Sequence, residues 1–215
     1  MALAIFDLDN TLLGGDSDYL WGRYLAENGI VDPQSYHDTN LAYYQAGQLD
    51  INAFLQFVFE PLAKNSMQNL LSWRAEYLQQ KIMPIILPKG RELIEYHRQQ
   101  GDTLLIITAT NSFLTKPIAE ILGIDHLIAT DPEMVDGRYT GQVQGVPSFQ
   151  HGKVVRLQHW LTEHQHNLAG SYFYSDSHND LPLLEQVETP IAVDPDETLA
   201  EIARQRDWKI LSLRE

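Results

Sequence analysis

The sequence contains no cysteine, and its basic residues are few. The absence of cysteine excludes disulfide bonds, zinc–thiolate sites and thiol nucleophiles. Charge-free runs such as residues 103–115 are shorter than the roughly 18–20 apolar residues that span a bilayer. The first basic residue is Arg23, so no positively charged region precedes an apolar signal segment. We therefore expect a soluble protein of the cytoplasm.

Negative charge dominates the chain: Lys and Arg total 15 and Asp and Glu total 29, a formal net charge of −14. Such a surface opposes binding to nucleic acid and to anionic membranes. It also repels an anionic substrate unless a metal ion or local cations reverse the sign at the site. The length of 215 residues and the 44% hydrophobic content indicate one globular domain, or a core domain that carries an insertion.

Short apolar runs alternate with helical patterns along most of the chain. The alternation implies right-handed βαβ units, so we expect an α/β fold with a doubly wound parallel sheet. The predicted strands are residues 3–9, 103–108, 127–129, 171–175 and 191–193. The predicted helices of this part are residues 90–100, 113–122, 154–164 and 181–187.

Residues 15–84 interrupt this alternation with consecutive helical patterns. Pro33 begins one pattern, Asp50 and Ser66 are expected N-caps, and Pro84 closes the block. We predict a helical cap domain here, inserted into a core domain of residues 1–14 and 85–215. A second, smaller insert at about 131–147 contains an Asp-Gly pair between alternating residues, which predicts a β-hairpin with a type I′ turn.

Polar side chains follow the predicted strands at one edge of the sheet. The carboxyl ends of parallel strands line the crevice where ligands bind in open α/β sheets. A lysine at a helix start adds a positive charge to the helix N-terminus, and both favour an anion. The residues expected to converge are Asp7, Asp9, Thr108, Lys153, Asp176, Asn179 and Asp180.

The chemistry of this set points to phosphoryl transfer. Clustered carboxylates, with neither cysteine nor a convincing histidine pair, favour a hard cation such as Mg²⁺. Thr108 and Lys153 would hold an anion beside the metal. A metal, an anion pocket and a spare carboxylate together are typical of phosphoryl-transfer sites.

The same residues, in this order, resemble the four motifs of the haloacid dehalogenase superfamily of phosphatases. The helical segment between the first two motifs resembles the phosphoserine phosphatase-like branch. Within that branch the sequence is similar to a bacterial group of histidinol-phosphatases and phosphoserine phosphatase-like proteins. The resemblance spans essentially the whole chain and rests on Asp7-Leu8-Asp9-Asn10-Thr11, Thr108, Lys153 and Ser175-Asp176-Ser177-His178-Asn179-Asp180.

The resemblance implies that Asp7 is the nucleophile that becomes an aspartyl-phosphate. It implies that Asp9 is the general acid and base. Thr108, Lys153 and Asn179 would bind the phosphate. In the dehalogenase members the position of Asp9 carries no acid, so Asp9 favours phosphate chemistry.

The resemblance also implies a Mg²⁺ ion as cofactor. Its ligands would be Asp7, the backbone carbonyl of Asp9 and Asp176. Asp180 would orient water molecules bound to the metal.

Asp16 stands where the phosphoserine enzymes place an acidic residue that holds the substrate ammonium. Aligning residues 46–50 with a glycine-containing stretch of those enzymes puts Val58 where they carry the arginine that binds the substrate carboxylate. Lys64 and Arg74 lie elsewhere in the segment. Because a buried carboxylate without a cationic partner is costly, we expect a small phosphorylated metabolite with an amine and no carboxylate. Histidinol phosphate is the first candidate.

Other side chains of the cap would then meet the organic part of the substrate. Asp18 would join Asp16 at the cationic end. Tyr19, Trp21, Tyr43 or Tyr44 could stack on an imidazole, although aromatic residues in a helical segment more often form its core.

Alternative functions remain open at this point. One is a phosphoserine phosphatase. Another is a receiver-like signalling protein that accepts a phosphoryl group, although such modules are usually about 120 residues long and lack the helical insert. A sugar-nucleotide transferase with a D-x-D motif would leave Lys153 and Asp180 unexplained, and a non-catalytic metal-binding module would not need both Asp7 and Asp9. The sequence leaves the oligomeric state open.

Overall fold

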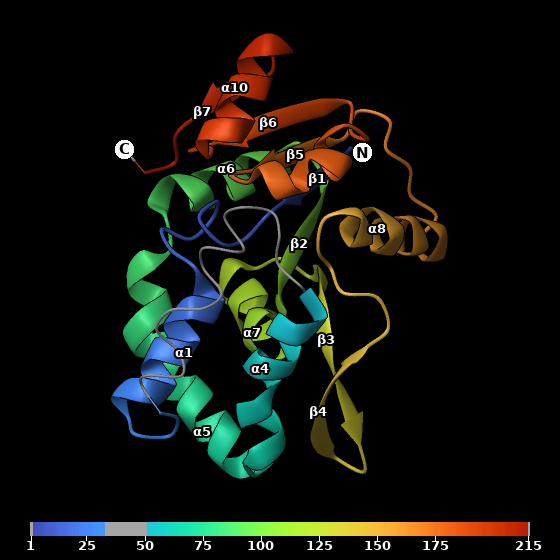
Figure 1. The fold of residues 1–215 in the computed structure, drawn as a ribbon. Coiled ribbons are helices and arrows are strands. Elements are labelled where there is room, and N and C mark those ends of the chain that lie inside the picture. The colour runs from blue at the N-terminus through green and yellow to red at the C-terminus, as the bar shows by residue number, and fades with distance from the viewer. Residues whose placement is uncertain (1, 33–50, 215) are drawn as a thin grey trace.

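The computed structural model describes residues 2–32 and 51–214, and its strands form one sheet in the order β4-β3-β2-β1-β5-β6-β7 (Figure 1). All neighbouring strands are parallel except the pair β3–β4. This sheet confirms the α/β fold class. The strands are β1 Leu3–Phe6, β2 Thr103–Asn111, β3 His126–Val135, β4 Arg138–Gln144, β5 Tyr172–Ser175, β6 Thr189–Val193 and β7 Lys209–Leu211.

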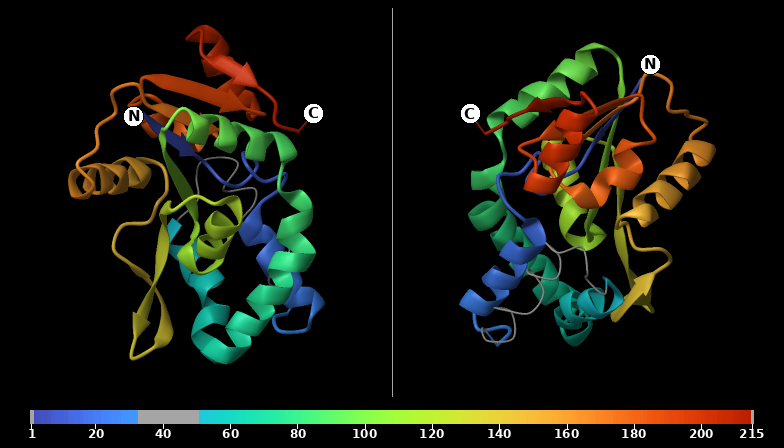
Figure 2. Two further views of the ribbon diagram at one scale, coloured as in Figure 1. Left: turned by 180° about the vertical axis from the view of Figure 1, so that it is seen from behind. Right: turned by 45° about the horizontal axis from the view of Figure 1, so that its top comes forward.

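Helices cover both faces of the sheet, and β1 shows why. Side chains of a strand alternate between the two faces. Ala4 and Phe6 share an apolar cluster with α6 and α7, whereas Leu3 and Ile5 pack with residues of α8, α9 and α10. The left view of Figure 2 shows the same arrangement from behind. The helices are α6 Pro88–Gln99, α7 Ser112–Leu122, α8 His151–Glu163, α9 Leu181–Leu184 and α10 Glu197–Gln205.

A group of helices between β1 and β2 lies together at one end of the sheet (Figure 1). Its aromatic residues form its core, with Trp21 stacked on Tyr24 and edge-on to Tyr77. The Ser66 side chain caps α5, as predicted. The group comprises α1 Ser17–Glu27, α4 Ile51–Lys64, α5 Met67–Tyr77, the π-helical turn η1 Leu78–Ile82 and the 3₁₀ turn η2 Met83–Ile85.

Some predictions for this segment are not tested. The expected helix start at Pro33 and the N-cap at Asp50 lie outside the described residues. The division into a core and a cap at residues 14 and 85 stays a prediction. Across residues 2–32 and 51–214, the helices are all too short or too polar to cross a membrane.

The two chain segments that join this helical group to the sheet run side by side. The Gly14 N–H donates to the Ile85 carbonyl at 2.7 Å, and the Leu87 N–H donates to the Leu12 carbonyl at 3.1 Å. These bonds flank an antiparallel bridge between Leu13 and Ile86. The hydrogen bonds therefore tie the chain just after the first motif to the segment that leaves the helical group.

The predicted hairpin is confirmed. Asp136 and Gly137 connect β3 to β4 with φ angles of 50° and 77°, and a type I′ turn requires positive φ at both central residues. The third strand does not stop at residue 129, as the sequence predicted, but continues to Val135 into the hairpin.

Other elements also differ from the prediction. The second strand continues past residue 108 to Asn111 through an irregularity in its pairing with β3. The helix expected at 181–187 is only four residues long. Neither α10 nor β7 was predicted from the sequence. Beyond β6, β7 completes the sheet and α10 completes one of its helical layers.

The start of α8 leaves no room for a side chain at Gly152, where an added Cβ atom would lie 2.0 Å from the Pro147 carbonyl oxygen. We expect Gly152→Ala to lower the free energy of unfolding by about 2–3 kcal/mol, because the backbone must move to relieve the clash. Urea unfolding measures this. Gly15→Ala is the matched control, since its Cβ would make only ordinary contacts at 3.5 and 3.7 Å. Equal unfolding midpoints for the two variants would contradict the prediction.

Candidate active site

The candidate site lies where the order of strands reverses. From β1 the chain builds the sheet outward through β2 and β3 on one side, and through β5, β6 and β7 on the other. Ligands bind at such switch points in open α/β sheets. Phe6 pairs with Tyr174, and the Asp7 N–H donates to the Tyr174 carbonyl at 2.8 Å. Asp7 and Asp176, which follow β1 and β5, are thereby brought to the same edge.

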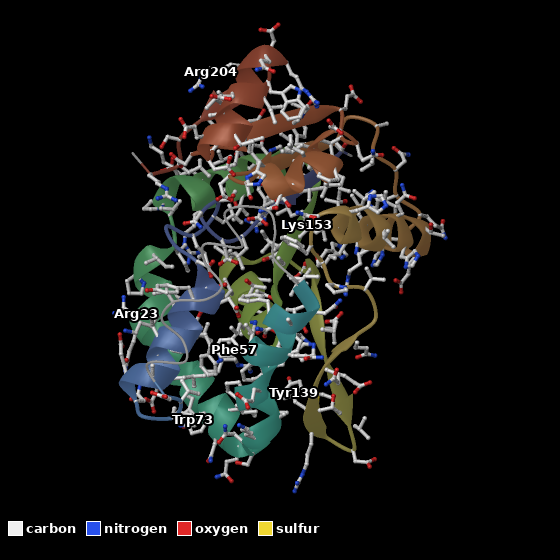
Figure 3. The ribbon with its side chains drawn as sticks, viewed as in Figure 1. Arg23, Phe57, Trp73, Tyr139, Lys153 and Arg204 are labelled. Atoms are coloured by element: carbon white, nitrogen blue, oxygen red, sulfur yellow. The ribbon has the colours of Figure 1, made fainter. Side chains whose placement is uncertain are left out.

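Lys153 joins two carboxylates at this edge. Its Nζ lies 2.7 Å from Asp7 Oδ1 and 2.7 Å from Asp180 Oδ1. The Ser175 hydroxyl donates to Asp180 Oδ2 at 2.7 Å. Lys153 is only 3% exposed, and Figure 3 shows it at the end of α8 nearest the centre of the molecule. The structure thus brings together residues from β1, α8 and the segment after β5.

The carboxylates here outnumber the positive charges. Burial raises the pKa of Asp7 well above its usual value, and Asp180 and Asp176 raise it further, although Lys153 opposes them. Burial and Asp180 also raise the pKa of Asp176 to about 7. The Thr11 hydroxyl donates to Asp176 Oδ1 at 3.1 Å. A divalent cation would supply the missing positive charge.

The donor set fits Mg²⁺, which prefers oxygen ligands and keeps several waters. Two carboxylates, Asp7 and Asp176, flank the carboxyl end of β1 and could bind a metal together with a main-chain carbonyl. Asp180 is already engaged by Lys153 and Ser175, which suits an indirect role. In the part of the chain that the structure describes, His, Asp and Glu side chains do not form a metal site of three or more such groups by themselves.

Asp9 is held by donors from two different parts of the chain. The Ser17 N–H, at the start of α1, donates to Asp9 Oδ1 at 2.6 Å, and the Thr110 hydroxyl donates to Oδ2 at 2.8 Å. Burial raises the pKa of Asp9, although hydrogen bonds from Ser17 and Thr110 lower it. A raised pKa suits a carboxyl group that must give up a proton and take one back.

Thr110 is a site residue that sequence reasoning missed. The predicted strand stopped at Thr108, whose hydroxyl is buried and lies 3.5 Å from Asp9 Oδ2, farther than the Thr110 hydroxyl. The available signal was the second threonine two residues on, on the same side of an extended chain.

Asn179 is also buried at this edge, beside Asp180 in the short turn η3 (His178–Asp180). Its Oδ1 accepts a hydrogen bond from Gln150 Nε2 at 2.9 Å, and its Nδ2 donates to the Ser177 hydroxyl at 3.3 Å. Gln150 is a second residue that the sequence analysis did not single out. All seven residues expected to converge therefore lie at the strand ends or at the start of α8: Asp7, Asp9, Thr108, Lys153, Asp176, Asn179 and Asp180.

Two more carboxylates adjoin Asp9 at the start of α1. Asp16 caps this helix by accepting from the Tyr19 N–H at 2.8 Å, and burial together with Asp9 raises the pKa of Asp16 to about 7. Asp18 accepts from Asn111 Nδ2 at 3.3 Å. Burial, Asp16 and Asp9 raise the pKa of Asp18 well above its usual value. This corner of the site favours a positively charged ligand group.

The basic residues of segment 15–84 all lie in its described part, and each one has a partner. Lys64 pairs with Glu60 at the surface, and the Arg74 guanidinium donates to the Phe113 carbonyl at 2.6 Å. The other two, Arg23 and Lys81, both pair with Glu27. Val58, at the expected arginine position, is buried in the apolar core.

The aromatic residues considered for stacking on a substrate differ in their placement. Trp21 is buried in the core between the helices, where it also contacts Phe113. Tyr19 is 41% exposed. Tyr43 and Tyr44 lie outside the described residues.

A cavity of about 320 Å³ lies away from this edge, between the turn that joins α4 to α5 and the tip of the hairpin. Tyr139, labelled in Figure 3, forms part of its wall with Lys64 and Arg138. None of the seven converging residues lines it.

Solved structures resemble this fold. A structure of a protein of unknown function from Bordetella pertussis Tohama I matches with a TM-score of 0.93 and 44% identity, covering 99% of this chain and 98% of that chain. A phosphoserine phosphatase, solved as an analogue of its phospho-aspartyl intermediate, matches with a TM-score of 0.73 and 19% identity. That match covers 100% of this chain and 94% of the other, and it concerns the fold alone.

Proteins with similar sequences include phosphatases. A histidinol-phosphatase of Neisseria meningitidis is 43% identical over 219 residues, which cover 99% of this chain and 99% of that protein. A phosphoserine phosphatase of Mycobacterium tuberculosis is 32% identical over 222 residues, covering 99% of this chain and 71% of that protein. The haloacid dehalogenase-like hydrolase family matches residues 4–185. The chain therefore belongs to the haloacid dehalogenase-like hydrolases and is a phosphatase of that family.

Proposed function

We propose that this phosphatase hydrolyses a small amine-bearing phosphomonoester through an aspartyl-phosphate on Asp7, with Mg²⁺ as cofactor. The observation that carries the proposal is the buried Lys153 ammonium held between Asp7 and Asp180, 2.7 Å from each. This arrangement places a cation and a nucleophile at one point. Asp9, an acid with a raised pKa, follows two residues after Asp7.

In the first step a carboxylate oxygen of Asp7 attacks phosphorus and the bond from phosphorus to the ester oxygen breaks. Asp9 donates its proton to the departing oxygen, which leaves as an alcohol. In the second step Asp9 takes a proton from a water molecule as that water attacks the phosphorus of the aspartyl-phosphate. Asp7 is regenerated and inorganic phosphate is released.

The surrounding residues prepare these steps. Lys153 and the Thr108 hydroxyl bind oxygens of the phosphate, and Asn179 contributes its amide. Asp7, Asp176 and the Asp9 carbonyl would hold Mg²⁺, with Asp180 orienting the metal's water ligands. When bound, the ion supplies positive charge that neutralises the phosphate and keeps the nucleophilic carboxyl ionised.

Histidinol phosphate is the first candidate substrate. Asp16 and Asp18 would meet a positively charged group, and the engaged basic residues of segment 15–84 leave a substrate carboxylate without a partner there. The 43% identical histidinol-phosphatase supports the same choice. Phosphoserine, which carries both an ammonium and a carboxylate, is the alternative.

Replacement of the nucleophile tests the mechanism. We expect Asp7→Asn to abolish phosphate release from a panel of about thirty metabolite phosphates, because an amide is too weak a nucleophile. We expect EDTA to have the same effect on the unaltered protein. Asp136→Asn, the same change at the tip of the hairpin, should leave release unchanged. Turnover that persists in Asp7→Asn would overturn the role of Asp7.

A comparison of two substrates tests the specificity. We expect kcat/KM for histidinol phosphate to exceed that for phosphoserine by at least about tenfold, because an unpaired buried carboxylate costs more than 1.4 kcal/mol. Steady-state kinetics under identical conditions measures both values. A kcat/KM that favours phosphoserine by tenfold or more would establish the alternative.

The pKa of Asp16 predicts how stability depends on pH. Because this pKa is about 7 in the folded protein and about 4 in an unfolded chain, the folded state binds more protons between these values. The contribution of protonated Asp16 to the free energy of unfolding is therefore fully present below about pH 4 and is lost as the pH rises toward 7.

We expect Asp16→Asn, which keeps a capping side chain, to be more stable than the unaltered protein by about 1–2 kcal/mol at pH 8 and equally stable at pH 4. Urea unfolding in EDTA at both pH values provides the measurement. A stability difference that is the same at pH 4 and pH 8 would count against the raised pKa.

A further inference from the structure

Gln150 has a backbone conformation that an L-amino acid rarely adopts. Its φ and ψ angles are 48° and −121°, in a region that favours glycine. It precedes the first turn of α8 at the N-cap position, yet its side chain does not cap the helix. Keeping a residue other than glycine in such a conformation lowers the stability of the fold. A role of the Gln150 side chain would explain why glutamine is present there.

The residues on both sides of Gln150 make close contacts. The Ser148 N–H donates to the buried Thr130 hydroxyl at 3.0 Å, and the Gly152 N–H donates to the Phe149 carbonyl at 2.8 Å. An added Cβ at Gly152 would lie 2.0 Å from the Pro147 oxygen. The turn before α8 is therefore closely packed against its surroundings.

The Gln150 side chain makes a hydrogen bond to the candidate phosphate site. Its Nε2 donates to Asn179 Oδ1 at 2.9 Å. An asparagine amide has an oxygen that only accepts and a nitrogen that only donates. With its oxygen occupied by Gln150, Asn179 keeps its nitrogen as the end that can donate to an anion.

The opposite orientation of this amide would present an oxygen to the phosphate. Asn179 is 5% exposed, so bulk water has little access to replace the Gln150 donor. The Ser177 hydroxyl, 3.3 Å from Asn179 Nδ2, accepts from the nitrogen and agrees with the same orientation, but as a hydroxyl it could also donate to an oxygen placed there. Gln150 is likewise an amide that can turn to accept, so its contact holds the Asn179 side chain in place in either orientation.

We propose that Gln150 is a positioning residue that holds the Asn179 side chain in place at the candidate phosphate site. This inference rests on the phosphate-binding role proposed above for Asn179. The strained backbone keeps the Gln150 side chain directed across to η3, three residues before Lys153 on the same turn. The start of α8 thus supplies both a cation, Lys153, and a hydrogen-bond partner for Asn179.

The test uses four variants of the full chain: Gln150→Gly, Asn179→Ala, the double variant and Gln165→Gly. Gln165 is the matched control, since it is an exposed glutamine with a φ of 54° that follows the C-terminal end of α8, away from Gln150 at its start. The readouts are the inhibition constant of inorganic phosphate, kcat and KM separately, and the midpoint of thermal unfolding.

We expect Gln150→Gly to raise the phosphate inhibition constant about tenfold, as the loss of one oriented hydrogen bond predicts. Its thermal midpoint should not fall, because relief of the strained φ offsets the lost bond. Gln165→Gly should leave the inhibition constant unchanged. Because Gln150 acts through Asn179, the double variant should bind phosphate no more weakly than Asn179→Ala.

The outcomes separate this inference from the function on which it rests. If Asn179→Ala weakens phosphate inhibition but Gln150→Gly does not, the positioning role is wrong and the role of Asn179 stands. If the double variant shows the product of the two single effects, Gln150 does not act through Asn179. If Asn179→Ala has no effect, the phosphate-binding role of Asn179 is wrong, and the inference falls with it.

Discussion

The buried ammonium of Lys153, bound between Asp7 and Asp180, is the interaction around which this molecule is arranged. Charges can be buried only when they are paired and their remaining hydrogen-bonding capacity is used. The pairing here requires β1 and β5 to be neighbours and α8 to begin at the same edge of the sheet. Ser175 uses part of the remaining capacity of Asp180.

Lys153 does not neutralise all of the carboxylates around it, and the charge that remains favours the binding of a further cation. One ammonium faces Asp7, Asp176 and Asp180, so negative charge remains in excess and the pKa values of Asp7 and Asp176 rise. A site that is self-sufficient in charge has little affinity for a further cation. This one lacks positive charge where a phosphoryl-transfer site needs it.

Most of the fold could be predicted from the sequence because its signals are local. Apolar runs, helical periodicity and an Asp-Gly turn each depend on a few neighbouring residues, and the alternation of strands and helices indicates a doubly wound parallel sheet. The helix α10 also carried a signal that was overlooked, since Asp196 caps it and Leu199 and Ala203 lie four apart on its buried face. The three-residue strand β7 is too short for a periodic pattern to reveal it.

The residues of the candidate site also fall into those that the sequence predicted and those that it did not. Its carboxylates could be placed from the sequence because the ends of parallel strands meet at one edge. Thr110 was missed because an irregular pairing between β2 and β3 extends the strand past its apparent end, although the second threonine two residues after Thr108 was a signal for it. Gln150 could not be placed from the sequence, because its side-chain position depends on an unusual backbone conformation that no pattern of neighbouring residues indicates.

Hydrogen bonds to Asp9 connect the helical segment to the candidate site at the edge of the sheet. One oxygen of its carboxyl group accepts from Ser17 on α1, and the other accepts from Thr110 on β2. Both bonds stabilise the ionised form, against the burial that raises the pKa. The proton affinity of Asp9 therefore depends on the relative position of α1 and β2. The helical segment after β1 therefore bears on the proton transfer proposed for Asp9, because α1 supplies one of the hydrogen-bond donors that lower the pKa of this carboxyl group.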